Sequence, residues 1–246
     1  MAPISILFLG NNTGYSNQVK TALETAGYNL TLNGDLVISA AYGKKLPPGG
    51  LNLHPSLLPA YRGATPVPHQ ILDGISESGI TIIKMTGEFD AGPIVAQQTV
   101  PVRPDDTSLD LLNRCFAAGS HLLIKILPTY LNNKITLKPQ PAKSPTPYCK
   151  RFTKQDGFIA WEEFKRGADE RRVRALFPWP GVWTTMPNGK ILKLLPKNMY
   201  QLAIAIHKIL KNILIRYIED SDILWLLKKV IDSFHTKDKV EVGLPL

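Results

Sequence analysis

The chain has 246 residues, of which 44% are hydrophobic and 20% are charged. This composition excludes a disordered chain, and the length suits one large domain or one domain with a small second one. No run of about 18 uncharged apolar residues is present, so we expect no membrane span. The N-terminus lacks the features of a signal peptide, and Cys115 and Cys149 stand in no metal-binding spacing. We therefore expect a cytoplasmic protein with reduced thiols and no metal.

The net charge of +9 is unevenly distributed along the chain. Residues 1–98 carry 5 basic and 6 acidic side chains, whereas residues 134–174 carry 11 basic and 5 acidic ones. Positive charge concentrated in one part of a chain is typical of proteins that bind a polyanion such as RNA. A lysine-rich solvated surface would give the same count, so the charge alone leaves both interpretations open.

The first part of the chain alternates strand and helix patterns. An apolar run over 4–10 that ends in glycine predicts a buried parallel strand, and 36–41 predicts a second one. Between them, 16–26 begins with serine, is rich in helix formers and is followed by Gly27, which predicts a helix. The glycines at 10–14 lack the lysine of a phosphate-binding loop, and we interpret them as a tight strand-to-helix turn.

Shorter elements follow. Residues 51–54 alternate in polarity and predict a short strand, and 66–73 can form a helix with proline at its start. Residues 79–85 and 94–102 predict two strands joined by a turn. The order of strands and helices favours the α/β class with a doubly wound, Rossmann-like parallel sheet.

The organisation changes towards the C-terminus. Residues 106–127 have helical spacing, with Asp, Thr and Ser at the start and Pro128 as the expected end. We predict a first domain over 1–133 and a basic linker rich in proline and lysine over 134–155. An aromatic, turn-rich region over 156–196 follows, and the apolar spacing over 197–246 predicts a helical tail.

Three polar residues stand where chemistry is expected. Asn52 and His54 are two residues apart on a predicted strand, so their side chains project to the same face. Ligands of open α/β sheets bind at the carboxyl ends of the strands. Asp90 lies in a loop between two strands, and an aspartate beside a histidine would orient the imidazole and favour its charged form. A strand-end histidine with a purely structural role remains the alternative from spacing alone.

At these residues the sequence resembles a known family. The segments LNLHPSLLPAYRGATPVPHQILDG at 51–74 and GITIIKMTGEFDAGPIVAQQTVPVRPDDTSLDL at 79–111 are similar to the signature of the folate-dependent formyltransferases. Within that superfamily, SPTPYCKRFTKQDGFIAW at 144–161 and VRALFPWPGVWT at 173–184 resemble the methionyl-tRNA formyltransferases. The resemblance implies a formyltransferase catalytic domain over 1–133 and the start of the family's C-terminal domain over 156–196.

The resemblance also implies a reaction. The amine of methionyl initiator tRNA attacks the formyl carbon of 10-formyltetrahydrofolate, and tetrahydrofolate leaves, as a step of translation initiation. Carried over by position, Asn52 and His54 bind the formyl oxygen and its developing charge, and Asp90 partners His54 and helps to move the proton. The loop expected against the folate consists of Ser56, Leu57, Leu58 and Pro59.

The chain departs from the family at two places. Only residues 28–34 stand where the family has two further strands, a helix and a loop that reaches the tRNA acceptor end. We therefore expect strands 4–10 and 36–41 to be direct parallel neighbours, with the exposed edge shielded by 29–32. After Pro196 the expected strands of the C-terminal domain are replaced by the helical tail.

These departures leave alternatives open. One is a formyltransferase that acts on a small amine, such as an amino sugar nucleotide or glycinamide ribonucleotide. Another is an inactive RNA- or folate-binding remnant, although Asn52, His54 and Asp90 are all retained. For the leading interpretation we expect a monomer whose linker contacts the tRNA phosphates. The expected contacts are Lys134, Lys138, Lys143, Lys150, Arg151 and Lys154.

Overall fold

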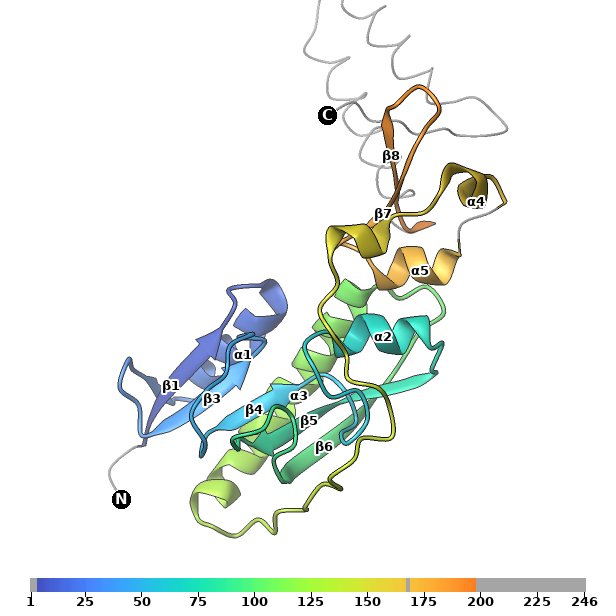
Figure 1. Cartoon of the computed structure of the whole chain (residues 1–246). Coiled ribbons are helices and arrows are strands. Elements are labelled where there is room, and N and C mark those ends of the chain that lie inside the picture. The colour runs from blue at the N-terminus through green and yellow to red at the C-terminus, as the bar shows by residue number, and fades with distance from the viewer. Residues whose placement is uncertain (1–3, 167–168, 198–246) are drawn as a thin grey trace, which may run out of the picture. The chain divides into compact units, whose positions relative to one another are not determined.

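Figure 1 shows the computed structural model of the chain, which describes residues 4–166 and 169–197. The chain divides into two compact units, the first ending at Phe152 and the second beginning at Thr153. This boundary lies inside the segment 134–155 that the sequence predicts as a linker. Most of that segment therefore belongs to the first unit.

The first unit is built on a six-stranded sheet, and the predicted α/β class is confirmed. The strand order is β2-β1-β3-β4-β5-β6. In this order the strands are Asn29–Leu30, Ser5–Gly10, Leu36–Ala40, Leu51–His54, Glu77–Lys84 and Ile94–Pro101. The first four are parallel, whereas β5 pairs antiparallel with both β4 and β6. The sheet is thus mixed. The loop over 85–93 is shorter than the dozen or so residues that a parallel crossover needs, which accounts for the antiparallel pairing of β5 with β6.

In the shortened N-terminal half the two predicted strands pair directly, as expected. β1 and β3 are parallel neighbours, with Ile6 opposite Leu36, and the helix α1 (Gly14–Thr25) forms the connection. The short strand β2 pairs with the beginning of β1 and covers that part of its edge. The helix begins slightly earlier than expected, because Thr13 rather than Ser16 caps it. The Ser16 hydroxyl instead donates a hydrogen bond of 3.0 Å to the Ala40 carbonyl.

Two further helices pack on the sheet. The predicted helix α2 is present at Pro66–Leu72. The long helix α3 (Ser108–Leu131) lies across one face of the sheet and contacts β5, β6, α1 and α2 (Figure 1). A capping box between Thr107 and Asp110 fixes its start. The expected end at Pro128 is wrong, since the helix continues to Leu131. Proline lacks an N–H, but its carbonyl still accepts hydrogen bonds from Asn132 and closes the last turn.

The core lies between the sheet and these helices. Its largest fully buried side chains include Phe116 of α3, Ile6 of β1 and Leu53 of β4. Gly119 of α3 allows a close approach, because a Cβ at this position would lie 2.8 Å from Ile80 and 3.2 Å from Leu53. Leu53 of β4, the residue between Asn52 and His54, thereby packs close to α3.

Residues 138–152, called the strap here, have no helix or regular strand but are fixed to the sheet unit. Lys138 pairs with Ile94 through two backbone hydrogen bonds of 2.8 and 2.9 Å. Further along, the Cys149 amide donates to the Arg62 carbonyl, and the Cys149 carbonyl accepts from the Ala64 amide. The predicted extended conformation is therefore present, and the segment forms part of the fold.

The second unit is described over residues 153–166 and 169–197. It contains a 3-10 turn η1 (Lys154–Gly157), helices α4 (Trp161–Lys165) and α5 (Glu170–Ala175), and an antiparallel pair of β7 (Val182–Thr185) and β8 (Ile191–Leu194). The rings of Phe158 and Trp183 pack at 4.9 Å. The helical tail predicted over 197–246 lies outside the described residues, except for its first residue. No helix in the described ranges is long and apolar enough to cross a bilayer.

Candidate active site

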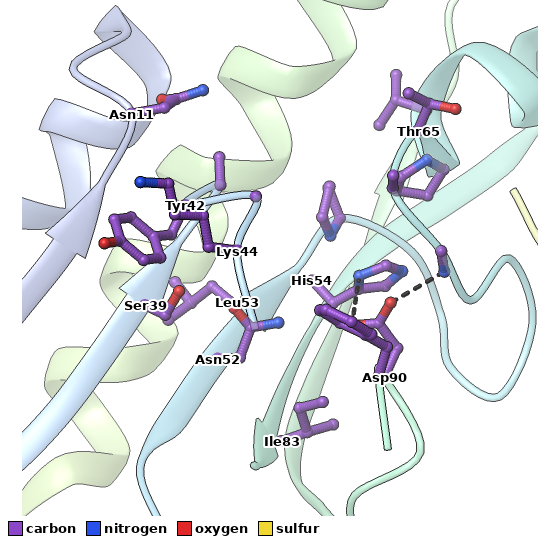
Figure 2. A pocket seen from close by; sticks show the side chains of 18 of the residues that line it. Asn11, Ser39, Tyr42, Lys44, Asn52, Leu53, His54, Thr65, Ile83 and Asp90 are labelled. Carbon is purple, nitrogen blue, oxygen red and sulfur yellow. Dashed lines mark hydrogen bonds and ion pairs between the residues drawn. The ribbon is translucent and has the colours of Figure 1, made fainter. Parts of the chain in front are cut away.

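A cavity of about 660 Å³ opens at the carboxyl ends of β3 and β4 in the first unit. This is the end of the sheet at which the sequence predicts a ligand. Figure 2 shows Ser39 of β3 beside Asn52 of the neighbouring strand β4, with His54 further along β4 and Tyr42 in the loop after β3. Asp90 reaches the same cavity from the loop between β5 and β6.

Strand β4 positions the first two polar side chains. Leu51 and Leu53 are fully buried in the core and fix the register of the strand. Asn52 and His54 alternate with them, and both line the cavity. The alternation of side chains along a strand is what brings an amide and an imidazole to one surface.

His54 is held at both ring nitrogens and is only 4% exposed. Its Nδ1 lies 3.3 Å from Oδ1 of Asp90, and its Nε2 donates to the Tyr61 carbonyl at 2.9 Å. Tyr61 has a left-handed backbone, with φ of 58°. The predicted meeting of His54 and Asp90 is therefore observed, and the Tyr61 carbonyl is an additional partner.

Asp90 is fixed through its side chain and its backbone. Its Oδ2 accepts a hydrogen bond of 2.9 Å from the Gly63 amide, while its carbonyl oxygen accepts one of 2.9 Å from Nε2 of Gln140. Its φ of 53° lies in the left-handed region, which non-glycine residues adopt only at a cost in free energy. The loop is thus held in a conformation that aims the carboxylate at His54.

The surroundings favour the charged forms of both residues. Burial by itself lowers the pKa of His54, but the charge and hydrogen bond of Asp90 and the Tyr61 carbonyl outweigh it, so the pKa is raised. Burial would raise the pKa of Asp90, but the His54 charge, its hydrogen bond, the Gly63 amide and the charge of Arg62 together lower it. Each partner therefore favours the charged form of the other, the imidazolium of His54 and the carboxylate of Asp90.

The predicted folate loop lies elsewhere. Ser56 and Leu58 are buried, and the Ser56 and Leu58 backbones are hydrogen-bonded to Thr81 of β5. Pro59 accepts from the Ser144 hydroxyl of the strap through its carbonyl. None of the four residues predicted to contact the folate lines the cavity, namely Ser56, Leu57, Leu58 and Pro59. These contacts are those of a turn that follows β4 and is bonded to β5.

The predicted tRNA contacts divide into three groups. Lys150 and Arg151 line the cavity. Lys154 belongs to the second unit. The structure does not bring the remaining three, Lys134, Lys138 and Lys143, to the cavity.

Several cavity residues are absent from the sequence prediction. Lys44 and Lys45 lie in the loop after β3. Their position after a parallel strand could have indicated a place near the ligand. Phe89 and Tyr148 also line the cavity and remain 51% and 52% exposed. Nothing in the local sequence of Tyr148 indicates this placement, because it depends on the path of the strap. Within the described residues, no group of three His, Cys, Asp or Glu side chains is placed to hold a metal ion.

Two family profiles match the chain. The profile described as formyl transferase matches residues 6–127, and the profile described as formyl transferase, C-terminal domain, matches residues 151–208. The second match continues beyond residue 196, where the recognisable motifs end.

Curated relatives match over most of this chain. It is 41% identical over 172 residues to a methionyl-tRNA formyltransferase from Roseiflexus sp. (strain RS-1), which covers 67% of this chain and 52% of the relative. It is 36% identical over 212 residues to a methionyl-tRNA formyltransferase from Dehalococcoides mccartyi (strain CBDB1), covering 80% of this chain and 66% of the relative. The chain thus spans about half to two thirds of the length of these relatives.

Solved structures share the fold at lower identity. HypX from Aquifex aeolicus, solved in complex with tetrahydrofolic acid, has a TM-score of 0.66 and 20% identity, over 79% of this chain and 38% of that one. A sugar N-formyltransferase from a Shewanella species has a TM-score of 0.61 and 18% identity, over 78% and 96% of the two chains.

Proposed function

Because this chain belongs to the formyl transferase family, we propose that it transfers a formyl group from 10-formyltetrahydrofolate to the amine of methionyl initiator tRNA. The observation that carries the proposal is the paired His54 and Asp90 beside Asn52 in one cavity. The proposed setting is translation initiation in the cytoplasm, by a monomer.

The cavity suits a folate in size and lining. Its volume of about 660 Å³ lies within the range of sites for small organic ligands. Its lining includes the apolar side chains of Leu46, Val67, Ile83 and Met85 as well as the polar residues Asn52, His54 and Asp90. We propose that the folate ring system packs against these apolar side chains, while Ser56–Pro59 support the site without touching the folate.

Asn52 and His54 supply the stabilisation that the reaction needs. Attack of the amine nitrogen on the formyl carbon forms a C–N bond and leaves negative charge on the formyl oxygen. The Asn52 amide can donate a hydrogen bond to that oxygen, and the charged His54 ring stabilises it electrostatically. Direct donation from Nε2 of His54 requires this atom to leave the Tyr61 carbonyl, whereas the effect of its charge requires no movement.

Asp90 holds the imidazolium and assists the proton transfer. The attacking amine must lose a proton, and the folate nitrogen must gain one as the bond from that nitrogen to the formyl carbon breaks. We propose that Asp90 helps to move this proton through water. No redox step is required, and the atoms balance as formyl-methionyl-tRNA and tetrahydrofolate.

The cavity rim suits the acceptor end of a tRNA. Lys44, Lys45, Lys150 and Arg151 supply positive charge for the phosphates. The exposed rings of Phe89 and Tyr148 lie on the same cavity and can stack with unpaired bases. Cations combined with exposed aromatic rings are typical of surfaces that bind single-stranded nucleic acid.

The test is a formyl-transfer assay with three acceptors side by side. Methionyl initiator tRNA, glycinamide ribonucleotide and an amino sugar nucleotide are each supplied with 10-formyltetrahydrofolate and the full chain. We expect formylation of the tRNA, and its loss in Asn52→Ala and His54→Ala. Transfer only to a small amine would reject the proposed acceptor. The short segment 28–34 makes this alternative worth testing, because it stands where the family has the loop that reaches the tRNA. Folate binding without transfer to any acceptor would indicate an inactive remnant.

A further inference from the structure

Arg62 is a buried cation whose side-chain hydrogen-bond partners lie on the strap. It is 8% exposed and stands in the loop between β4 and α2. Its Nη1 donates to the Ala142 carbonyl at 3.1 Å and its Nη2 to the Pro141 carbonyl at 2.8 Å. Its Nε and Nη2 both donate to Oε1 of Gln140, at 3.2 and 2.9 Å. The guanidinium therefore fixes the amide oxygen of Gln140 from two directions.

The other end of the same amide holds the loop that carries Asp90. Nε2 of Gln140 donates to the Asp90 carbonyl at 2.9 Å and to the Gly92 carbonyl at 2.6 Å. With its oxygen held by Arg62, the amide has only one orientation that satisfies all its partners. Both of its N–H groups are directed at the loop between β5 and β6.

This loop needs external support. Asp90 has a left-handed backbone, and Gly92 approaches β5 so closely that a Cβ there would lie 1.9 Å from the Lys84 carbonyl. Strained conformations of this kind persist only where neighbouring groups hold them. The two hydrogen bonds from Gln140 clamp the loop on both sides of Ala91.

We propose that Gln140, oriented by Arg62, is a positioning residue that holds the Asp90 carboxylate against His54. The proposal rests on the proposed function for its relevance to catalysis, but its physical content is the geometry of the pair. The alternative is that Gln140 only attaches the strap to the sheet unit. The two differ in what happens to His54 when Gln140 is replaced.

The pKa of His54 separates these alternatives. Burial lowers this pKa, and the contact with Asp90 raises it. If Asp90 moves away after Gln140 is replaced, the lowering effect of burial dominates and the pKa falls. A residue that merely attaches the strap would reduce stability without changing this value.

The experiment compares Gln140→Met with the matched control Gln97→Met in the full chain. Gln97 also donates two hydrogen bonds from Nε2, to the Leu58 carbonyl at 2.8 Å and Thr81 Oγ1 at 2.9 Å, and none to the Asp90 loop. The pKa of His54 is measured by NMR titration, with its signal assigned by its loss in His54→Gln. We expect a lower pKa in Gln140→Met and an unchanged one in Gln97→Met.

Activity gives a second and separable result. If the chain is a formyltransferase, kcat/KM of Gln140→Met falls about 10- to 100-fold, because a small misplacement of a catalytic group has effects of this size. An unchanged His54 pKa in Gln140→Met overturns the proposal, whether or not the chain transfers formyl groups. A lower pKa without any activity in the wild type supports the positioning role and rejects the function. If Gln140→Met does not fold, Gln140→Asn, with the amide one methylene too short, is measured in its place.

Discussion

His54 faces a hydrogen-bond acceptor at each of its two ring nitrogens. A neutral imidazole carries one N–H, whereas the contacts with Asp90 and the Tyr61 carbonyl are both best satisfied by an imidazolium. The ring is therefore built to carry positive charge in a nearly closed environment. A charge of this kind has a large effect on an oxyanion, because little water is present to screen it.

The first prediction concerns the source of that charge. Asp90→Asn should lower the pKa of His54, since the carboxylate is removed while the ring stays buried. We expect turnover to fall by about 10²-fold or more, comparable with the loss of an oxyanion donor. NMR titration and a formyl-transfer assay measure the two effects.

The matched control is Asp73 at the end of α2, an aspartate that also accepts a side-chain hydrogen bond but does not pair with His54. Asp73 accepts a hydrogen bond of 2.9 Å from the Tyr61 hydroxyl and does not touch His54. Asp73→Asn should leave the His54 titration unchanged. Equal effects of the two substitutions would show that Asp90 does not act through the ring.

The second prediction concerns stability and pH. The raised pKa of His54 means that its contribution is fully present below about pH 6.5 and is lost as the pH rises through the folded value. The lowered pKa of Asp90 means that its contribution is present above about pH 3.8 and is lost as the pH falls through the folded value. Burial raises the pKa of Tyr148 and takes that of Cys149 to about 11, so neither of these neighbours titrates in mildly acidic solution.

The pair should therefore stabilise the fold most in mildly acidic solution. The difference in unfolding free energy between the wild type and His54→Gln, measured by urea, should be larger at about pH 5 than at about pH 9. A difference that grows with rising pH would contradict a raised pKa for His54.

At the scale of elements, the contact between α3 and β4 connects the core to the site. Gly119 allows α3 to approach Leu53, the residue between Asn52 and His54. An added methyl group would meet Ile80 at 2.8 Å, at an atom in the middle of that side chain. The sheet would have to move, and with it the strand that carries two of the three proposed catalytic groups.

The third prediction follows from this contact. Gly119→Ala should lower the free energy of unfolding, because overpacking costs about 1–3 kcal/mol and exceeds the gain of about 1 kcal/mol in helix propensity. Gly14→Ala in α1 is the control, since a Cβ at Gly14 would meet nothing within 4 Å. Urea unfolding of both variants gives the comparison, and an equally stable Gly119→Ala would show that the core accommodates the methyl group.

Local patterns predicted the elements better than their arrangement. The apolar runs of β1 and β3 and the capping residues of α3 are short-range signals, and these elements are present. The end of α3 was misplaced because the carbonyls of Pro128 and Tyr130 still find donors in the last turn. The antiparallel direction of β5 depends on pairing with β4 across the α2 connection, for which the sequence carries no periodic signal.

The site shows the same division between local and distant information. Asn52 and His54 share a face by strand alternation alone, and the family motif indicated Asp90. Gln140 was missed because the three residues that its side chain bonds, Arg62, Asp90 and Gly92, are separated from it by 48 to 78 residues in sequence. The family resemblance assigned Ser56–Pro59 to the folate, and in the structure the backbones of Ser56 and Leu58 are bonded to Thr81 of β5.

At the scale of the whole molecule, the basic residues of the first unit divide by position. Lys44, Lys45 and Lys150 line the cavity, while Lys134, Lys138 and Lys143 do not. These two sets carry equal charge, so a comparison between them separates a local binding site from a general attraction to polyanions.

The last prediction concerns how this charge is used. Each phosphate contact releases counterions, so tRNA binding should weaken steeply with salt, and the triple substitution Lys44→Ala/Lys45→Ala/Lys150→Ala should make that dependence shallower. Lys134→Ala/Lys138→Ala/Lys143→Ala removes the same charge away from the cavity and should change the slope less. Arg151 is kept in both variants, because it donates to the Gly43 carbonyl at 2.6 Å and holds the loop after β3.

Affinities for methionyl initiator tRNA and for an elongator tRNA are measured at several salt concentrations for all three proteins. Phosphate contacts carry little sequence information, and residues 28–34 replace the loop by which relatives are expected to reach the acceptor end. We therefore expect the two tRNAs to bind with similar affinities and similar salt slopes. Binding that does not depend on salt, or equal slopes for the two triple variants, would reject the cavity rim as the tRNA contact and favour a small amine as the acceptor.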